Sequence, residues 1–349
     1  MANIVFTGGG TAGHYAPNYA LIPLVKPYFD NVYYIGGSFG GEKDEARRNG
    51  IPYYGITCVK LIRGFTLKNL GIPFKLLKGI SEAKAVLKKL RPSVVFSKGG
   101  YVSLPVVIAS YKLNIPVISH ESDISVGLAN KIASKYSDVV LTSFKNTSGA
   151  PKNAVYVGTP IRESLFIKRD KYAVKKKYGV KTGKKILLII GGSQGSSAIN
   201  QAVRNALDEL VKTYEIIHIC GKGKKSGIVK DGYREIEYAE DIGEVYSIAD
   251  ASISRAGANT LFELISLKIP TLAVPLPKGN SRGDQVENAE YFKNNGLIEA
   301  LSEENLTTET LIKSLEKLEK DREKIKRKCA ETNFKGSAQR IAEYIKKYK

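Results

Sequence analysis

Short apolar segments alternate with longer amphipathic segments along most of the chain. In the first half the apolar segments have the length of strands and cover residues 4–7, 32–35, 53–57, 94–97, 117–119 and 139–142. Helical patterns separate them, notably at 16–28, 67–90 and 102–113. Alternation of strands with helices predicts an α/β fold, in which helices cover both faces of a parallel sheet.

The same alternation restarts in the second half. After a lysine-rich helical pattern at 171–178, strand patterns follow at 186–190, 216–219, 236–238, 251–254 and 271–274. Helical patterns lie at 198–211, 257–267 and 284–295, and the chain from Glu304 onward is helical and charged. Because 349 residues exceed a single comfortable core, we expect two domains, at residues 1–160 and 161–330. Residues 331–349 are expected to form a helix that crosses back to the first domain.

Two glycine-rich turns, about half a chain apart, each follow an apolar strand and open a helix. Gly8-Gly9-Gly10-Thr11-Ala12-Gly13-His14 forms the first, and Gly191-Gly192-Ser193-Gln194-Gly195 forms the second. At such a turn the backbone N–H groups and the helix dipole can face an anion. Residues 8–13 also match G-x-G-x-x-G, but the next strand ends in Gly36-Gly37-Ser38, without the acidic residue that a dinucleotide ribose requires. The pattern predicts phosphate binding rather than a dinucleotide site.

Polar groups follow two further strands of the first half. His14 stands at the start of a helix, where a neutral imidazole could accept a proton or orient a phosphate. Lys98-Gly99-Gly100-Tyr101 is either a second phosphate turn or an ordinary strand-to-helix turn. His120-Glu121-Ser122-Asp123 ends a strand, where α/β sheets place ligand groups. More polar residues stand there than a turn requires, which favours a functional role.

The segment from Ser254 to Glu263 is the most specific in the second half. It runs from a strand end into a helix start, so its N–H groups can meet a phosphate. Glu263 lies one turn inside that helix, below Thr260, where its carboxylate could accept both hydroxyls of a ribose. The alternative is a solvated glutamate. Further on, Asp284, Gln285 and Asn288 suit the recognition of sugar hydroxyls.

Taken in order, these motifs resemble the MurG-type N-acetylglucosaminyltransferases of bacteria, which convert lipid I into lipid II. The resemblance covers essentially the whole chain. Its motifs are residues 9–14, 98–101, 120–121, 158–162, 191–195, 254–263 and 284–288. It implies a GT-B fold, in which two Rossmann-like domains with parallel sheets face each other across a cleft. It also implies that the second domain holds most of UDP-N-acetylglucosamine (UDP-GlcNAc).

The resemblance carries roles over to particular residues. On the donor, Arg162 and Ala239 would lie near the uracil, and Glu263 would contact the ribose. The diphosphate would be bound by Ser193, Ala258, Asn259 and Thr260. Asp284 and Gln285 would contact the sugar hydroxyls. From the first domain, Thr11, Ala12 and Gly13 would approach the donor sugar, Asp123 would contact substrate, and Gly10, Gly99, Gly100 and Tyr101 would hold the acceptor diphosphate. Many family members carry asparagine at position 123 and a glutamine pair at 284–285, and aspartate offers no amide donor there.

The implied reaction inverts the anomeric carbon as the C4 hydroxyl of N-acetylmuramic acid (MurNAc) displaces UDP. His14 is the first candidate for the base, and Glu121 is the second. The helix start at Ala258 would meet the charge on the departing diphosphate. The chain has no Asp-x-Asp, the usual metal clamp of the other glycosyltransferase fold, so we expect no cofactor and no obligatory protein-bound metal.

Composition agrees with a membrane-embedded acceptor. The formal net charge of +20 argues for an anionic partner. Lysines and arginines at 60, 63, 68, 75 and 78 interleave with apolar residues at 61, 62, 65, 72, 74, 76 and 77, which predicts a surface for anionic lipid or the buried face of a core helix. Cys58, Cys220 and Cys329 are typical of reduced thiols, and neither a signal peptide nor an apolar run of spanning length is evident. We expect a peripheral protein on the cytoplasmic side of the cell membrane.

Two alternatives remain. A UDP-GlcNAc 2-epimerase of the same fold would not explain the segment 60–78, in which basic and apolar residues interleave. Of the two enzymes, only the epimerase would make UDP-ManNAc from UDP-GlcNAc. A nucleic-acid-binding protein would agree with the charge. However, the basic residues are spread over many helices, and no RNA- or DNA-binding motif is present. We therefore expect no nucleic-acid partner.

Overall fold

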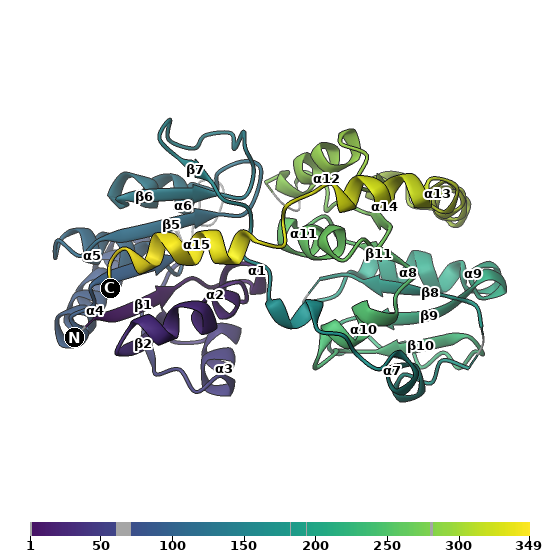
Figure 1. Cartoon of the computed structure of the whole chain (residues 1–349), viewed down its shortest axis with the longest axis horizontal. Helices are drawn as coiled ribbons and strands as arrows, with labels where there is room; N and C mark the ends of the chain where they lie inside the picture. Colours follow the sequence, from purple (N-terminus) through teal and green to yellow (C-terminus); the bar gives the residue numbers. More distant parts are fainter. Residues whose placement is uncertain (1, 61–70, 182, 193, 280–281) are drawn as a thin grey trace. The chain divides into compact units, whose positions relative to one another are not determined.

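The computed structural model describes residues 2–60, 71–181, 183–192, 194–279 and 282–349. The chain divides into two compact units, which are Met1–Arg162 with Lys335–Lys349 (unit 1) and Glu163–Phe334 (unit 2). Each unit contains one parallel sheet with helices on both faces (Figure 1). The predicted α/β class with two parallel sheets is therefore confirmed.

Unit 1 contains a seven-stranded sheet in the order β3-β2-β1-β4-β5-β6-β7. Its strands are β1 (Asn3–Thr7), β2 (Asn31–Gly37), β3 (Tyr53–Ile56), β4 (Val94–Ser97), β5 (Val117–Glu121), β6 (Val139–Thr142) and β7 (Val155–Tyr156). Its helices are α1 (Ala12–Tyr15), α2 (Asn18–Val25), α3 (Gly41–Arg48), α4 (Ile72–Leu90), α5 (Leu104–Tyr111), α6 (Leu128–Ala133) and α15 (Ser337–Lys346).

Unit 2 contains a six-stranded sheet in the order β10-β9-β8-β11-β12-β13. Its strands are β8 (Lys185–Ile190), β9 (Tyr214–Ile219), β10 (Tyr233–Ile236), β11 (Ala251–Ser254), β12 (Thr271–Ala273) and β13 (Glu299–Ala300). Its helices are α7 (Lys171–Lys177), α8 (Ser197–Asn205), α9 (Leu207–Thr213), α10 (Ile242–Ile248), α11 (Ala258–Ser266), α12 (Asp284–Asn294), α13 (Thr308–Lys320) and α14 (Arg322–Ala330).

The last helix of the chain belongs to the first unit. α15 packs beside α2, and its apolar side chains Ala338, Ile341, Ala342 and Ile345 complete the core on one face of the unit 1 sheet (Figure 1). Arg340 Nε also donates to the carbonyl oxygen of Val157, at 3.1 Å. The sequence of unit 1 is therefore discontinuous, because its last helix follows all of unit 2.

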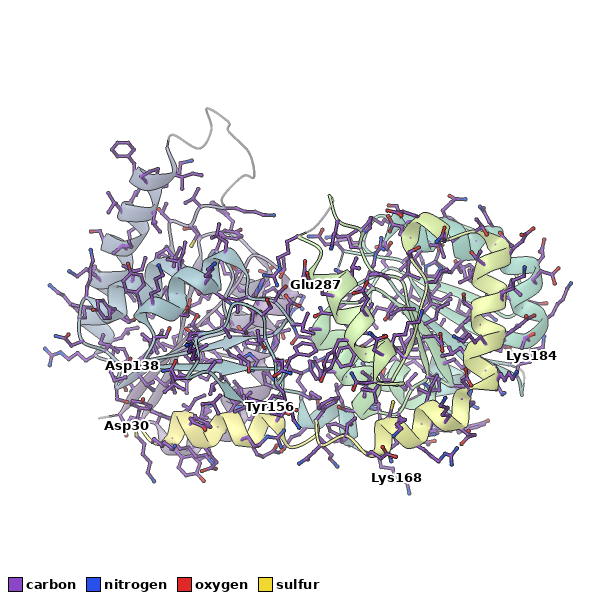
Figure 2. The ribbon with its side chains drawn as sticks, turned by 90° about the horizontal axis from the view of Figure 1, so that it is seen from above. Asp30, Asp138, Tyr156, Lys168, Lys184 and Glu287 are labelled. Carbon is purple, nitrogen blue, oxygen red and sulfur yellow. The ribbon has the colours of Figure 1, made fainter. Side chains whose placement is uncertain are left out.

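Carboxylates anchor the amino ends of the strands. Asp30 Oδ2 accepts from the N–H of Ala2 at 2.6 Å, and Asp138 Oδ2 accepts from the N–H of Val117 at 2.8 Å (Figure 2 labels both aspartates). In unit 2, Asp250 Oδ2 accepts from the N–H of Ile186 at 2.9 Å. These acids have structural partners, so the chemistry must be sought at the opposite, carboxyl ends of the strands.

Three predicted element boundaries are wrong. The strand expected at 236–238 is β10, Tyr233–Ile236, because its register pairs Tyr233 with Ile216 and the chain then turns away. The helix expected at 16–28 begins only after Pro17, as α2 (Asn18–Val25), and its last residues, Lys26–Tyr28, form a 3-10 helix instead. The helix expected at 198–211 is divided into α8 and α9, around Ala206.

Within the described parts of the chain, no helix is both long enough and apolar enough to cross a membrane.

Candidate functional site

The order of the strands decides where each unit gathers its loops. In unit 1 the chain order reverses between β1 and β4, and in unit 2 it reverses between β8 and β11. At such a switch point the loops on either side diverge and leave a crevice at the carboxyl ends of the strands, which is where open α/β sheets bind ligands. Residues 8–11 and 98–101 follow β1 and β4, so the two glycine turns predicted in the first half are neighbours in space.

Backbone contacts hold the two turns of unit 1 together. Gly10 (φ +87°) lies under the ring of Tyr101, which a Cβ at that position would overlap. Gly100 (φ +81°) lies against the imidazole, and its missing Cβ would stand 3.1 Å from both Cγ and Nδ1 of His14. Both glycines adopt a left-handed backbone that other residues rarely adopt. The glycines predicted to hold a diphosphate therefore also leave room for the two rings beside them.

His14 is oriented by its own turn. Its Nδ1 lies 2.9 Å from Thr11 Oγ1, and its backbone N–H donates to the carbonyl oxygen of Thr11 at 3.0 Å. The imidazole is half-buried and stands at the start of α1 with Ala12 and Gly13. If Nδ1 carries the proton and donates to Thr11, the lone pair of the ring is on Nε2. A base oriented in this way by a hydroxyl resembles the base and orienting group of a catalytic triad.

Glu121 has a different environment. Its side chain is 4% exposed, and each carboxylate oxygen accepts two hydrogen bonds. Oε1 accepts from the backbone N–H of Ser122 at 2.8 Å and of Asp123 at 3.0 Å. Oε2 accepts from the N–H of Gly127 at 3.1 Å and from Asn130 Nδ2 at 2.8 Å. This pattern favours an anchor for the loop between β5 and α6 over a proton acceptor.

Two buried side chains that can carry a positive charge, Lys98 and His120, lie beside Glu121. Lys98 is fully buried, its Nζ donates to Ser122 Oγ, and burial lowers its pKa to about 8 although Glu121 and Asp123 oppose the shift. His120 is also buried, and burial followed by the charge of Lys98 lowers its pKa well below the usual value. The imidazole is therefore neutral, with Nε2 donating to the carbonyl oxygen of Gly158 at 2.8 Å. Both side chains are therefore bonded inside unit 1, beneath the loops that follow β4 and β5.

Sequence reasoning missed Glu42, which stands in the first turn of α3. It is 1% exposed and its carboxylate lies against the glycine turn, where a Cβ at Gly9 would be 2.5 Å from Oε1. Oε1 has no hydrogen-bond partner in the described residues. The only sequence signal was an acid directly after Gly40-Gly41 at a helix start, which is common on solvated helices.

Four of the predicted donor residues lie on α11, which begins just after β11 ends. Gly257 is the N-cap, so the N–H groups of Ala258, Asn259 and Thr260 form the first turn, before the helical bond from Leu261 to Gly257. Glu263 follows on the same helix, half-buried, and its Oε2 accepts from Tyr246 Oη at 3.3 Å. The turn after β8 lies across the switch point from this helix. Its Ser193, predicted to contact the diphosphate, is outside the described residues.

The loop after β12 borders the same end of the sheet. Gln285 Oε1 accepts from the N–H of Leu276 at 3.0 Å, so the side-chain carbonyl is occupied within unit 2. Asp284 Oδ1 lies 3.4 Å from Arg282 Nε, and the buried Asn288 donates to the carbonyl oxygen of Ala256 at 3.3 Å. Asn288 therefore joins α12 to the turn that precedes α11, which is a structural role.

Arg255 is the second residue that sequence reasoning left without a role. Its Nη1 donates to the carbonyl oxygens of Val274 at 3.2 Å and Pro275 at 3.3 Å, and its Nη2 pairs with Glu303. It fixes the turn between β11 and α11 to the end of β12. Ala239, predicted near the uracil, is buried after β10. Arg162 ends the first of the two segments that form unit 1 and is half-buried.

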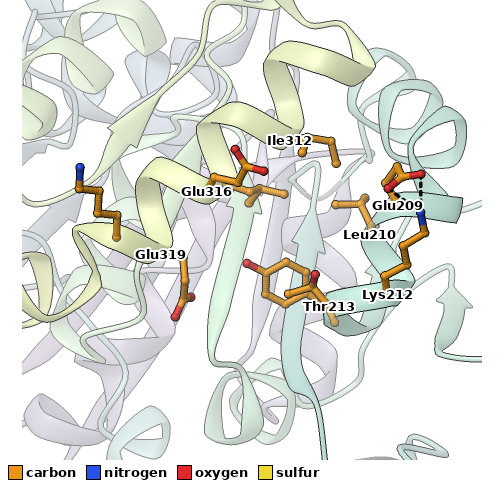
Figure 3. Close-up of a pocket in the computed structure, with 10 residues that line it drawn as sticks. Glu209, Leu210, Lys212, Thr213, Ile312, Glu316 and Glu319 are labelled. Atoms are coloured by element: carbon orange, nitrogen blue, oxygen red, sulfur yellow. Dashed lines mark hydrogen bonds and ion pairs between the residues drawn. The ribbon is translucent and has the colours of Figure 1, made fainter.

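A pocket in unit 2 lies away from all of these residues (Figure 3). Its volume is about 440 Å³, and its lining comes from the end of α9, the start of β9 and one side of α13. It lies at the amino end of β9, whereas the predicted site residues follow the carboxyl ends of β8 and β11. None of the predicted site residues lines it.

No group of three or more His, Cys, Asp or Glu side chains in the described ranges is placed to hold a metal ion. Each unit instead offers glycine turns and helix starts at the switch point of a parallel sheet. This combination is typical of α/β domains that bind phosphorylated ligands through backbone N–H groups.

Comparison with known proteins gives the family. Residues 4–142 match the N-terminal domain of glycosyltransferase family 28, and residues 186–345 match its C-terminal domain. The chain belongs to this family and is a glycosyltransferase.

Similar relatives span the full length. A protein of Clostridium perfringens named UDP-N-acetylglucosamine--N-acetylmuramyl-(pentapeptide) pyrophosphoryl-undecaprenol N-acetylglucosamine transferase is 46% identical over 99% of this chain and 98% of its own. A Clostridium kluyveri protein of the same name is 44% identical over the whole of both chains. The crystal structure of Acinetobacter baumannii MurG is 26% identical, with a TM-score of 0.77 over 99% of this chain and 100% of that one. The predicted GT-B fold and the predicted resemblance are thus confirmed.

Proposed function

We propose that this chain transfers GlcNAc from UDP-GlcNAc to the C4 hydroxyl of MurNAc in undecaprenyl-pyrophosphoryl-MurNAc-pentapeptide (lipid I), which gives lipid II for peptidoglycan synthesis. The observation that carries the proposal is the full-length similarity, at 44–46% identity, to relatives whose names state this transfer. The geometry agrees, because each unit has its own turns for a phosphorylated ligand and the reaction uses two such ligands.

Unit 2 is proposed to bind the donor. The start of α11 and the turn after β8 would hold the diphosphate, and Glu263 would accept hydrogen bonds from the ribose hydroxyls. Arg162 and Ala239 would lie near the uracil, and Asp284 with Gln285 would bind the sugar hydroxyls. Because Gln285 Oε1 accepts from Leu276, its NH₂ group is the part left to donate to a hydroxyl oxygen.

Unit 1 is proposed to bind the acceptor and to supply the base. Gly10 with residues 99–101 would hold the diphosphate of the lipid, and Thr11, Ala12 and Gly13 would approach the donor sugar. His14 Nε2 takes the proton of the C4 hydroxyl, whose oxygen bonds to C1 of GlcNAc as the bond from C1 to the diphosphate breaks. UDP leaves with the electron pair, and the start of α11 offsets its added charge. The bonding of Glu121 makes His14 the base that we favour.

The acceptor would be reached at an anionic membrane. On the first turns of α4, Phe74 and Leu77 are 76% and 60% exposed, and Lys75 and Lys78 are exposed beside them, whereas Leu76 packs against the core. Apolar side chains flanked by lysines suit the interface of an anionic bilayer. The preceding basic segment, 61–70, lies outside the described residues. We infer a peripheral location on the cytoplasmic side.

The decisive experiment measures transfer of radiolabelled GlcNAc from UDP-GlcNAc to a lipid I analogue. Product that depends on both substrates supports the proposal. Formation of UDP-ManNAc from UDP-GlcNAc alone, without transfer, would replace it with the epimerase alternative.

Membrane contact has its own test. The double variant Phe74→Ser with Leu77→Ser should lose most of its sedimentation with vesicles that contain anionic lipid. The matched control is Val229→Ser, which removes a 99%-exposed apolar side chain from unit 2. Equal vesicle binding by both variants would argue against α4 as the contact.

A further inference from the structure

A chain of three buried polar side chains crosses unit 2 below its glycine turn. Tyr233 Oη on β10 lies 2.8 Å from Nδ1 of His218 on β9, and His218 Nε2 lies 2.9 Å from Oδ1 of Asn200 on α8. Their exposed fractions are 3%, 0% and 2%. Because none of them reaches the surface, they cannot touch a substrate in solution. Buried polar groups with complete hydrogen bonding fix one arrangement of the elements that carry them.

The hydrogen bonds determine the direction of donation. Asn200 Nδ2 donates to the carbonyl oxygen of Cys220 at 2.9 Å, so its Oδ1 is the atom that faces the imidazole. His218 therefore donates from Nε2. In the neutral ring Nδ1 is an acceptor, and it competes with Glu235 Oε1 for the single hydroxyl hydrogen of Tyr233. Burial lowers the pKa of His218 to about 4, against the opposing influence of Glu235 and with the support of Arg204. The neutral imidazole that this pattern requires is present at pH 7.

This chain of hydrogen bonds ends at Cys220, which contacts the glycine turn after β8. The carbonyl of Cys220 lies directly against Gly195 (φ +69°), where any Cβ would overlap it. A Cβ at Gly221 (φ +96°) would likewise stand 2.5 Å from the carbonyl oxygen of Gln194. Two backbones can approach in this way only where side chains are absent. The position of the turn after β8 therefore depends on the position of Cys220, which Asn200 holds.

A second connection runs parallel to the first. Arg204, one turn further along α8, pairs with Glu235 and donates from Nη2 to the carbonyl oxygen of Lys224 at 2.5 Å. Lys224 Nζ in turn donates to the carbonyl oxygen of Gly195 at 3.2 Å. Tyr233 Oη also lies 2.9 Å from Glu235, so the two connections meet on β10. Both connections begin on α8, the helix whose start follows the glycine turn.

We propose that Asn200, His218 and Tyr233 are positioning residues for the donor diphosphate: they fix the described part of the turn after β8, residues 194–196, and the start of α8 in the arrangement that binds it. The inference rests on the proposed function of that turn. It identifies determinants of donor affinity that lie behind the binding surface and belong to no phosphate-binding motif.

The test compares two substitutions of one residue. His218→Ala removes both hydrogen bonds of the imidazole, whereas the amide of His218→Gln can still donate to Asn200 Oδ1. We expect His218→Ala to raise the Kd for UDP and the KM for UDP-GlcNAc about tenfold, because small displacements of binding groups weaken a preorganised site strongly. His218→Gln should stay within about threefold of the unsubstituted protein, and the KM for the lipid acceptor should change in neither.

A matched control separates positioning from general loss of stability. Ser252→Ala removes another fully buried hydrogen bond of unit 2, which is 2.8 Å long and joins β11 to Thr271 Oγ1 on β12. It should lower the melting temperature without raising the Kd for UDP. If His218→Ala does not fold, Tyr233→Phe, which loses one hydroxyl, gives the same comparison at smaller amplitude. UDP binding is measured by calorimetry below the melting temperature of each variant.

The proposal is overturned if the His218 and Tyr233 variants melt earlier but bind UDP as tightly as the unsubstituted protein. Failure of the proposed function has a different signature, because the unsubstituted chain itself would then neither bind UDP nor transfer GlcNAc.

Discussion

Replacing Glu121 by glutamine distinguishes an anchor from a catalytic base. The two oxygens of this carboxylate accept four hydrogen bonds, three from backbone N–H groups and one from Asn130. Glutamine keeps one oxygen, which can still serve two donors. Its NH₂ group then faces two N–H groups that donated to the carboxylate oxygen. These two hydrogen bonds are lost, because a donor now faces a donor.

The expected cost follows from these contacts. Hydrogen bonds to a charged group contribute about 1.5–3 kcal/mol each, so two losses at a site that is 4% exposed should cost about 3–6 kcal/mol. Lys98, whose Nζ bonds to Ser122, also loses the neighbouring negative charge that opposes the lowering of its pKa. For a domain of this size 1 kcal/mol corresponds to about 2–4 °C, so the unfolding of unit 1 should occur at least about 6 °C earlier.

The assay combines melting with kinetics. As an anchor, Glu121→Gln should lower the melting temperature and raise the KM for the lipid acceptor, with the pH profile of kcat unchanged. The control is Glu82→Gln, since Glu82 accepts two hydrogen bonds from Thr57 at a site that is 36% exposed and should cost far less. An unchanged melting temperature with kcat lowered 100-fold or more would refute the anchor role, because that is the result expected for a lost base.

Three further outcomes are expected. His14→Ala should lower kcat by about 10²–10⁴-fold in the GlcNAc transfer assay with little change in the KM for UDP-GlcNAc, and a fall below tenfold would exclude it as the base. Glu263→Ala should weaken UDP binding about tenfold by calorimetry, through loss of the bonds to the ribose, while kcat at saturating donor stays within a fewfold; an unaltered Kd would remove the ribose assignment. His218 should make unfolding pH-dependent: its pKa is about 4 when folded and 6.5 when unfolded, so the unfolded chain binds the proton first as pH falls, and the free energy of unfolding should drop by about 2 kcal/mol between pH 7 and pH 5. Urea titrations should show that drop reduced in His218→Gln, and an equal drop in both proteins would contradict the assignment.

The sequence alone determined the fold class and the family. Strand-length apolar segments alternate with helical patterns, and this local periodicity survives in any tertiary context, which is why β1, β4, β8 and β11 stand where they were expected. The glycine turns could also be recognised, because the left-handed backbone found at Gly10 and Gly100 favours glycine over other residue types. Boundaries set by distant partners, such as the register of β10 on β9, could not be derived in this way.

Only the tertiary structure decided which polar residues were already occupied. Glu121 and His14 were both candidates for the base on residue type. Four donors surround the carboxylate of Glu121, whereas the hydroxyl of Thr11 orients the Nδ1 of His14. Glu42 carried only a weak sequence signal and His218 carried none. The position of Glu42 matters because it is buried beside the distant Gly9, and that of His218 because it bonds to Asn200 and Tyr233. A sequence specifies the chemistry that each side chain can perform. Whether a side chain is already hydrogen-bonded within the protein depends on contacts between distant segments. These contacts exist only in the folded protein.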